Sequence, residues 1–79
     1  MRGAVIDLGT NTFNLVVFQT SKEGYEVLAN YKKPVNLGMG GINENKISSL
    51  ALERANKALE LFIEKCNQYK IKEIKAYGT

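Results

Sequence analysis

Cysteine, proline and long apolar runs are scarce in this 79-residue sequence, and each shortage narrows the possible kinds of protein. The single cysteine, Cys66, cannot form an intrachain disulfide, which suits a reducing compartment. The longest apolar run is far shorter than the roughly 20 residues that cross a bilayer. Met1-Arg2 leads straight into a strand-like segment without the features of a signal peptide. We therefore expect a cytoplasmic protein with no membrane partner.

The composition is that of a folded protein with a mild positive charge. Hydrophobic residues make up 44% of the chain, which is typical of a globular domain, and 79 residues suffice for one small domain. Eleven basic and eight acidic residues leave a net charge of +3. The lysines are dispersed or paired with glutamates instead of clustered, so we expect no nucleic-acid partner.

Three β-strands are predicted in the first 33 residues. Residues 3–6 form a short apolar run typical of a strand buried on both faces, and residues 13–20 form a second strand with apolar side chains on both faces. Residues 21–24 are typical of a hairpin turn. Residues 25–33 alternate, which predicts one apolar face made of Tyr25, Val27, Ala29 and Tyr31. The following Pro34 suits an edge strand.

A long helix and a last strand complete the predicted topology. Asn43 is a favourable N-cap, with Ile42 and Ile47 at the positions of a hydrophobic staple. Apolar residues then recur at helical spacing as far as Tyr69, in a stripe wide enough to lie on a sheet. Residues 71–77 predict a final strand, so the order is βββαβ. A helical crossover lets the final strand run parallel to the first.

The hexapeptide at residues 7–12, DLGTNT, lies between the first two strands and has two interpretations. As a tight turn, it uses the tolerance of Gly9 for positive φ and the backbone bonding of Asp and Asn. As a ligand loop, its glycine admits close approach, its N–H groups and small polar side chains contact phosphate, and Asp7 holds a divalent metal. An acid beside a donor-rich loop favours a metal–phosphate pair.

Four segments resemble, in order and spacing, the start of the exopolyphosphatase/guanosine pentaphosphate phosphatase (Ppx/GppA) family, within the actin, Hsp70 and sugar-kinase superfamily. They are DLGTNT at 7–12, VNLGMG at 35–40, the helix after Asn43, and AYGT at 76–79. The resemblance implies an α/β fold, a partial ribonuclease H-like (actin-like ATPase) subdomain with strand order 3-2-1-4, truncated before its remaining helices. Residues 1–79 would be the N-terminal part of a phosphate-binding domain, with no complete second domain.

The resemblance also implies a site and a reaction. Asp7 would hold Mg²⁺, and the phosphate-binding residues would be Gly9, Thr10, Asn11, Thr12, Gly38 and Gly40. The substrate would be inorganic polyphosphate or guanosine penta- or tetraphosphate, hydrolysed at a terminal phosphoanhydride bond. In this family the glutamate base and a second glycine-rich phosphate motif lie beyond residue 79. We therefore expect no catalytic residue within this chain, and no hydrolase activity from the chain alone.

Two positions depart from the family pattern and leave alternatives open. Asn14 stands where many members have a basic residue, and Asn36 where many have arginine, so phosphate neutralisation is weaker and the substrate is undecided. An ATP-using relative (a sugar kinase or an Hsp70-like ATPase) also begins with Asp-x-Gly-Thr, and a non-catalytic scaffold would keep the fold alone. A sheet face without its helices predicts exposed apolar surface and a homodimer.

Overall fold

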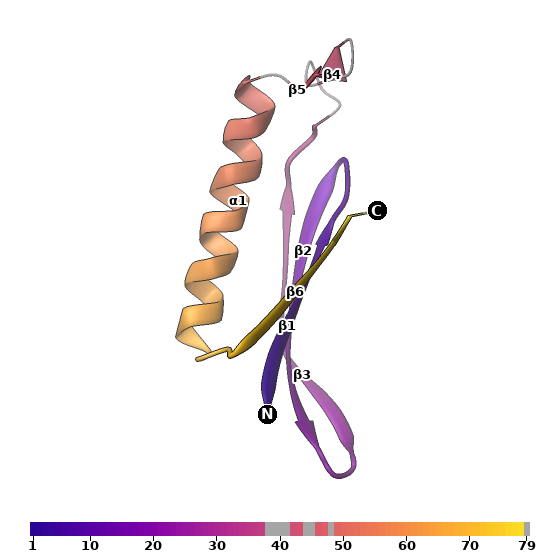
Figure 1. The fold of residues 1–79 in the computed structure, drawn as a ribbon, viewed down its shortest axis with the longest axis vertical. Helices are drawn as coiled ribbons and strands as arrows, with labels where there is room; N and C mark the ends of the chain where they lie inside the picture. The colour runs from indigo at the N-terminus through magenta and orange to yellow at the C-terminus, as the bar shows by residue number, and fades with distance from the viewer. Residues whose placement is uncertain (38–41, 44–45, 48, 79) are drawn as a thin grey trace.

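The computed structural model describes residues 1–37, 42–43, 46–47 and 49–78. Its elements are β1 (Arg2–Leu8), β2 (Thr12–Ser21), β3 (Gly24–Pro34), β4 (Ile42–Asn43), β5 (Lys46–Ile47), α1 (Ser49–Gln68) and β6 (Glu73–Gly78) (Figure 1). The four long strands form one sheet in the order β3-β2-β1-β6. The antiparallel pairs are β1–β2 and β2–β3, whereas β6 runs parallel to β1. The predicted α/β class and the strand order 3-2-1-4 are confirmed.

The core lies between α1 and one face of the sheet (Figure 1). Period-two alternation places Ala4 and Ile6 of β1 beside Leu15 and Val17 of β2, and each is at most 5% exposed. The helical stripe meets them as predicted, through Ala58, Phe62 and Cys66. The expectation that β1 is buried on both faces is wrong: Val5 is only half-buried, because α1 covers a single face.

A bulge in β3 overturns the predicted single apolar face of that strand. Val17 pairs with Ala29, whereas Phe18 pairs with Val27, so Leu28 is an extra residue in the ladder. One extra residue reverses the alternation. Ala29 and Tyr31 therefore pack against the core, whereas Tyr25 and Val27 are 74% and 51% exposed. Apolar exposure on the uncovered part of the sheet is thus confirmed; the homodimer stays a prediction.

The start of the helix also differs from the prediction. Asn43 is not an N-cap but part of β4, which pairs with β5 in the register Ile42↔Ile47 and Asn43↔Lys46, and α1 begins at Ser49. The spacing explains the error. A hydrophobic staple joins residues five apart, and a two-residue hairpin also pairs residues five apart, so the two isoleucines suit either arrangement.

The C-terminal end of α1 delivers the chain to β6 through a Schellman motif. Lys70 has φ 56°, and the N–H groups of Lys70 and Ile71 donate to the carbonyls of Asn67 and Cys66, at 3.1 and 3.0 Å. This turn reverses the chain and sets β6 beside β1. Within the part of the chain that the structure describes, no helix has the length and apolarity needed to span a membrane.

Candidate phosphate and metal site at the carboxyl end of β1

The predicted phosphate loop, residues 9–12, is the tip of the hairpin that joins β1 to β2. The Gly9 N–H donates to the Thr12 carbonyl at 3.2 Å and closes the hairpin. The tip lies where the parallel strands β1 and β6 both end (Figure 1). Ligands of open α/β sheets collect at the carboxyl ends of such strands. The structure therefore places the predicted loop where the topology favours a ligand.

The backbone at this tip carries two N–H groups that face no acceptor. Thr10 and Asn11 are exposed, and among the described residues their N–H groups have no hydrogen-bond partner. Their carbonyls, in contrast, are engaged by the chain that follows β3. The Val35 and Asn36 N–H groups donate to the Asn11 carbonyl at 2.8 and 3.0 Å, and the Leu37 N–H donates to the Thr10 carbonyl at 2.8 Å. Fixed carbonyls and free N–H groups are the arrangement that binds anions.

Asp7 and Asn14 bring two buried acceptor oxygens together beside this tip. They pair across β1 and β2, which puts both side chains on the sheet face opposite α1, with Cβ atoms about 5 Å apart. The Oδ1 atoms of both residues are buried and have no hydrogen-bond partner, and they are the two such side-chain atoms among the described residues. Leaving a buried acceptor unpaired costs roughly 1–3 kcal/mol. The strand pairing therefore brings together two residues that each carry a buried oxygen able to accept a hydrogen bond or to bind a cation.

The strand register extends this pair into a transverse polar row made of Tyr77, Asp7, Asn14 and Lys32. Asp7 pairs with Tyr77 of β6, and Asn14 pairs with Lys32 of β3. Paired residues share a sheet face, so Lys32 brings a positive charge to the row and Tyr77 brings a hydroxyl. Asn14, Lys32 and Tyr77 were missed as site residues because they meet only through the register, which no local motif encodes.

The second predicted loop is held against the first. Val35 is fully buried, and Asn36 adopts a left-handed φ of 47°. Arg54 of α1 reaches both: its Nε donates to the Val35 carbonyl at 2.7 Å and an Nη to the Asn36 carbonyl at 2.9 Å. Of the predicted phosphate contacts on this loop, Gly38 and Gly40 lie outside the described residues.

The residues present fit a magnesium ion that is held mainly by substrate and water. Among the described residues, no group of three or more His, Cys, Asp or Glu side chains could enclose a metal. Mg²⁺ does not require one, because it commonly binds through one or two protein oxygens, several waters and phosphate oxygens. The orphaned oxygens of Asp7 and Asn14 supply such a donor pair.

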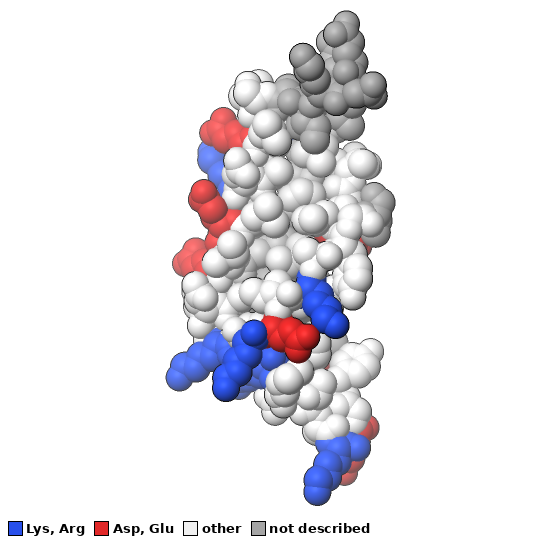
Figure 2. Space-filling model, in the orientation of Figure 1, with Lys and Arg blue, Asp and Glu red and all other residues white. Residues whose placement is uncertain are grey.

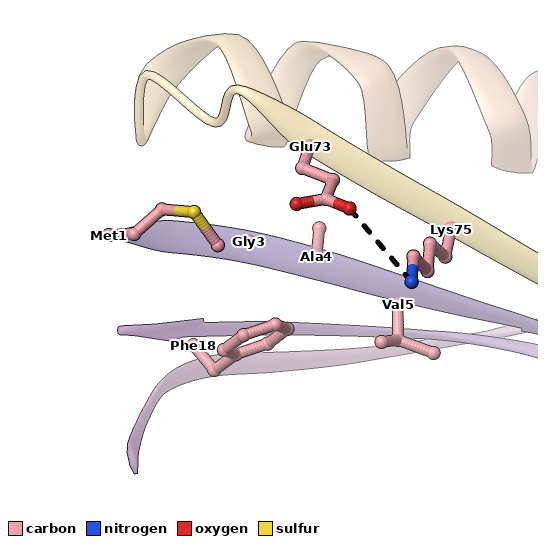
Figure 3. Close-up of a pocket in the computed structure, with 7 residues that line it drawn as sticks. All are labelled: Met1, Gly3, Ala4, Val5, Phe18, Glu73 and Lys75. Carbon is pink, nitrogen blue, oxygen red and sulfur yellow. Dashed lines mark ion pairs between the residues drawn. The ribbon is translucent and has the colours of Figure 1, made fainter. Parts of the chain in front are cut away.

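Two hollows lined by described residues lie elsewhere. A cavity of about 320 Å³ lies at the amino end of β1, and Figure 3 shows its lining, with the Glu73–Lys75 ion pair at 3.9 Å along one side. A second, of about 350 Å³, is lined by Val5, Val16, Phe18 and Tyr25. Neither includes a predicted site residue. The candidate site is thus an open strand edge instead of a closed pocket.

In the view of Figure 2, acidic side chains lie along the outer side of α1, and basic ones gather near its C-terminal end and at the tip of the β2–β3 hairpin. Cys66 is buried in the core, and this burial raises the pKa of its thiol. A hydrogen bond with Tyr31 is the main cause that raises the pKa of Tyr69.

Known structures match this fold closely. No protein-family model matches the sequence. An exopolyphosphatase from Cytophaga hutchinsonii superposes with a TM-score of 0.92 at 35% identity, over 99% of this chain and 25% of that one. The Ppx/GppA phosphatase of Aquifex aeolicus superposes with a TM-score of 0.90 at 19% identity, over 99% and 26%. An exopolyphosphatase-like protein has a TM-score of 0.83 at 24% identity, over 95% and 24%.

These matches confirm that the chain resembles the Ppx/GppA exopolyphosphatases. The chain fits the N-terminal segment of those proteins. The chain has a part of the actin-like fold found in that phosphatase family. It spans about a quarter of the length of the proteins it matches.

Proposed function

We propose that this chain forms one side of a polyphosphate-binding site in a phosphohydrolase of the Ppx/GppA type. The observation that carries the proposal is the juxtaposition at the carboxyl end of β1. Two unpaired N–H groups, of Thr10 and Asn11, lie beside two buried oxygens without donors, of Asp7 and Asn14. Donors for an anion next to acceptors for a cation suit a metal-bound phosphate chain.

The terminal phosphate would bind against the hairpin tip. The N–H groups of Thr10 and Asn11 would donate to its oxygens, with the hydroxyls of Thr10 and Thr12 as further donors and Gly9 allowing close approach. Lys32 would neutralise part of the charge from the end of the polar row. Gly38 and Gly40 remain expected contacts from the second loop.

Asp7 would hold Mg²⁺, with the side-chain oxygen of Asn14 as its neighbour. When bound, Mg²⁺ would neutralise negative charge on the phosphate chain. The chain's own contribution is to orient the phosphate chain across the strand ends. The proposed reaction of the whole phosphatase is hydrolysis of a terminal phosphoanhydride bond of polyphosphate or guanosine pentaphosphate. We assign no general base within this chain, so we expect the chain alone to bind the phosphate compound without hydrolysing it.

Calorimetric titration of the 79-residue chain with sodium tripolyphosphate, with and without Mg²⁺, tests the proposal. We expect saturable binding that Mg²⁺ strengthens by about tenfold, the effect of roughly 1.4 kcal/mol of added interaction. Sulfate serves as a control for simple anion binding, and ATP tests the nucleotide-using alternative. Equal affinity for sulfate and tripolyphosphate would contradict the proposal, and a marked preference for ATP would favour a kinase- or Hsp70-like relative.

A phosphate-release assay on the same samples tests the separation of binding from hydrolysis. We expect no release above the rate without protein, because a single side of the site cannot both activate water and stabilise the leaving group. Mg²⁺-dependent release that disappears in Asp7→Asn would show that the chain contains a base that we have not assigned.

A further inference from the structure

Arg54 reaches from the covered face of the sheet to the chain segment behind the hairpin tip. It lies in α1, partly buried, and its guanidinium donates to two successive carbonyls, those of Val35 at 2.7 Å and Asn36 at 2.9 Å. The two bonds come from Nε and one Nη, so the planar fork of the side chain spans both carbonyls at once. A lysine ammonium cannot reproduce this geometry, because it is a single point of charge.

The two carbonyls determine where the following N–H groups point. In a planar trans peptide, the C=O of one residue and the N–H of the next point in opposite directions. With the Val35 carbonyl turned to Arg54, the Asn36 N–H faces away from it and donates to Asn11 at 3.0 Å. With the Asn36 carbonyl turned the same way, the Leu37 N–H donates to Thr10 at 2.8 Å.

The same geometry acts once more at the hairpin tip. Because the Thr10 carbonyl is held by Leu37, the N–H of Asn11 points away from residues 35–37. That N–H is one of the two unpaired donors of the candidate site. A chain of two hydrogen-bonded peptide planes, 36–37 and 10–11, thus joins the Arg54 guanidinium to the group that would contact phosphate.

Backbone strain indicates that this segment needs an external hold. Asn36 adopts a φ of 47°, a left-handed conformation that asparagine tolerates better than most residues but that still costs more free energy than it does for glycine. A strained conformation persists only where its surroundings enforce it. The buried Val35 side chain anchors one end, and the Arg54 fork holds both carbonyls beside the strained residue.

We propose that Arg54 is a positioning residue for the phosphate-binding tip, acting through residues 35–37 without contacting the ligand; the proposal rests on the function proposed above. Removing the fork frees the Val35 and Asn36 carbonyls, so residues 36 and 37 lose their fixed direction. The Asn11 N–H then samples orientations that do not face a bound anion.

Hydrogen exchange and ligand titration of Arg54→Gln, followed by amide NMR, test this role. We expect amide exchange at Asn36 and Leu37 to become about tenfold faster without ligand, and tripolyphosphate affinity to fall by about tenfold. The tripolyphosphate-induced shift of the Asn11 amide should shrink in parallel, a change that a purely structural role would not produce. Arg54→Lys keeps the charge but not the fork, so it should lose less amide protection and less tripolyphosphate affinity than Arg54→Gln. The lysine variant also serves as the test if the glutamine variant does not fold.

Lys57→Gln is the matched control. It removes a positive charge from the same helix, where Lys57 is exposed and pairs with Glu53 at 3.2 Å, and should leave exchange and affinity unchanged. Unaltered amide exchange and tripolyphosphate affinity in Arg54→Gln would overturn the inference. An equal loss of tripolyphosphate affinity in Lys57→Gln would overturn it as well. Absence of tripolyphosphate binding by the unaltered chain overturns the proposed function instead, and exchange at residues 36 and 37 still decides whether Arg54 holds the segment.

Discussion

The two ends of the β1–β2 ladder are built from similar residues but satisfy their polar groups differently. At the end that carries the chain's amino terminus, the Thr20 N–H and hydroxyl both donate to the Met1 carbonyl, at 2.8 and 3.2 Å. Arg2 donates to Gln19 at 3.3 Å and to the Tyr69 carbonyl at 2.9 Å. At the other end, Asp7 and Asn14 bury oxygens that have no partner.

Under the proposed function, this contrast separates structural polar groups from groups that bind a ligand. Native proteins rarely leave a buried polar atom unpaired, because the loss is roughly 1–3 kcal/mol for each. Both ends have an arginine that caps backbone carbonyls, so a lack of donors in the sequence does not explain the difference. Among the described residues, the unpaired buried side-chain oxygens belong to Asp7 and Asn14, at the end where we propose that a ligand binds.

The largest expected effect comes from Asp7→Asn. The change removes the negative charge from the proposed metal position and keeps the shape of the side chain. We expect the Mg²⁺-dependent part of tripolyphosphate affinity to fall by about 30-fold, near 2 kcal/mol, with little change when Mg²⁺ is absent. Calorimetry measures both values. As a control, Glu26→Gln also replaces a carboxylate by an amide, towards the opposite end of the sheet. An equal loss of Mg²⁺-dependent affinity in that variant would remove the contrast between the two ends.

Asn14→Leu should have a smaller effect than Asp7→Asn. It should raise stability but weaken binding. Replacing the orphaned amide by an apolar side chain removes an unpaired buried atom, so we expect the free energy of unfolding to rise by about 1 kcal/mol. Mg²⁺ affinity should fall at the same time. Urea denaturation and calorimetry measure the two changes. Thr20→Val, which removes a paired hydroxyl at the other end, should instead lower stability by about 0.5 kcal/mol; a stabilising Thr20→Val would undermine the comparison.

Effects on stability of about the same size as that of Asn14→Leu are expected from the two left-handed residues, Asn36 and Lys70. Asn36→Ala should lower the free energy of unfolding by about 1 kcal/mol, because Cβ disfavours this conformation and the asparagine side chain tolerates it better. At Lys70, beyond the C-terminal end of α1, Lys70→Gly should raise stability by a similar amount without changing tripolyphosphate binding. Thermal denaturation with and without tripolyphosphate distinguishes them. A binding loss in Lys70→Gly would mean that strain at either end serves the site.

Much of the fold follows from the sequence because it rests on short-range periodicity. The apolar runs of residues 3–6 and 13–20 and the helical stripe predicted the elements that form the core, which includes Leu15, Val17 and Phe62. The bulge at Leu28 was not predicted, because one inserted residue does not alter the overall composition of a strand. The pairing of β4 with β5 was not predicted, because the spacing of Ile42 and Ile47 also fits the hydrophobic staple of a helix.

The site was predictable where it is local and hidden where it depends on register. The loop at residues 9–12 and its acid Asp7 form a contiguous motif, and its position at the strand ends is confirmed. Asn14 was noted only as a departure from the family pattern, and Lys32 joins it only when β3 is aligned on β2. Arg54 lies 18 residues from the carbonyl of Asn36 that it holds, and no spacing in the sequence links the two.

Paramagnetic broadening by Mn²⁺ tests the central claim most directly, because it locates the ion. Trace Mn²⁺ added to the ¹⁵N-labelled chain with tripolyphosphate should broaden the amide signals of Asp7, Thr10, Asn11 and Asn14. Those of Thr20 and Gly24, at the opposite end, should keep their widths. Excess Mg²⁺ should reverse the broadening, and Asp7→Asn should abolish it. Broadening spread evenly along the chain, or centred on the Glu73–Lys75 side of the sheet, would contradict a metal–phosphate site at the carboxyl end of β1.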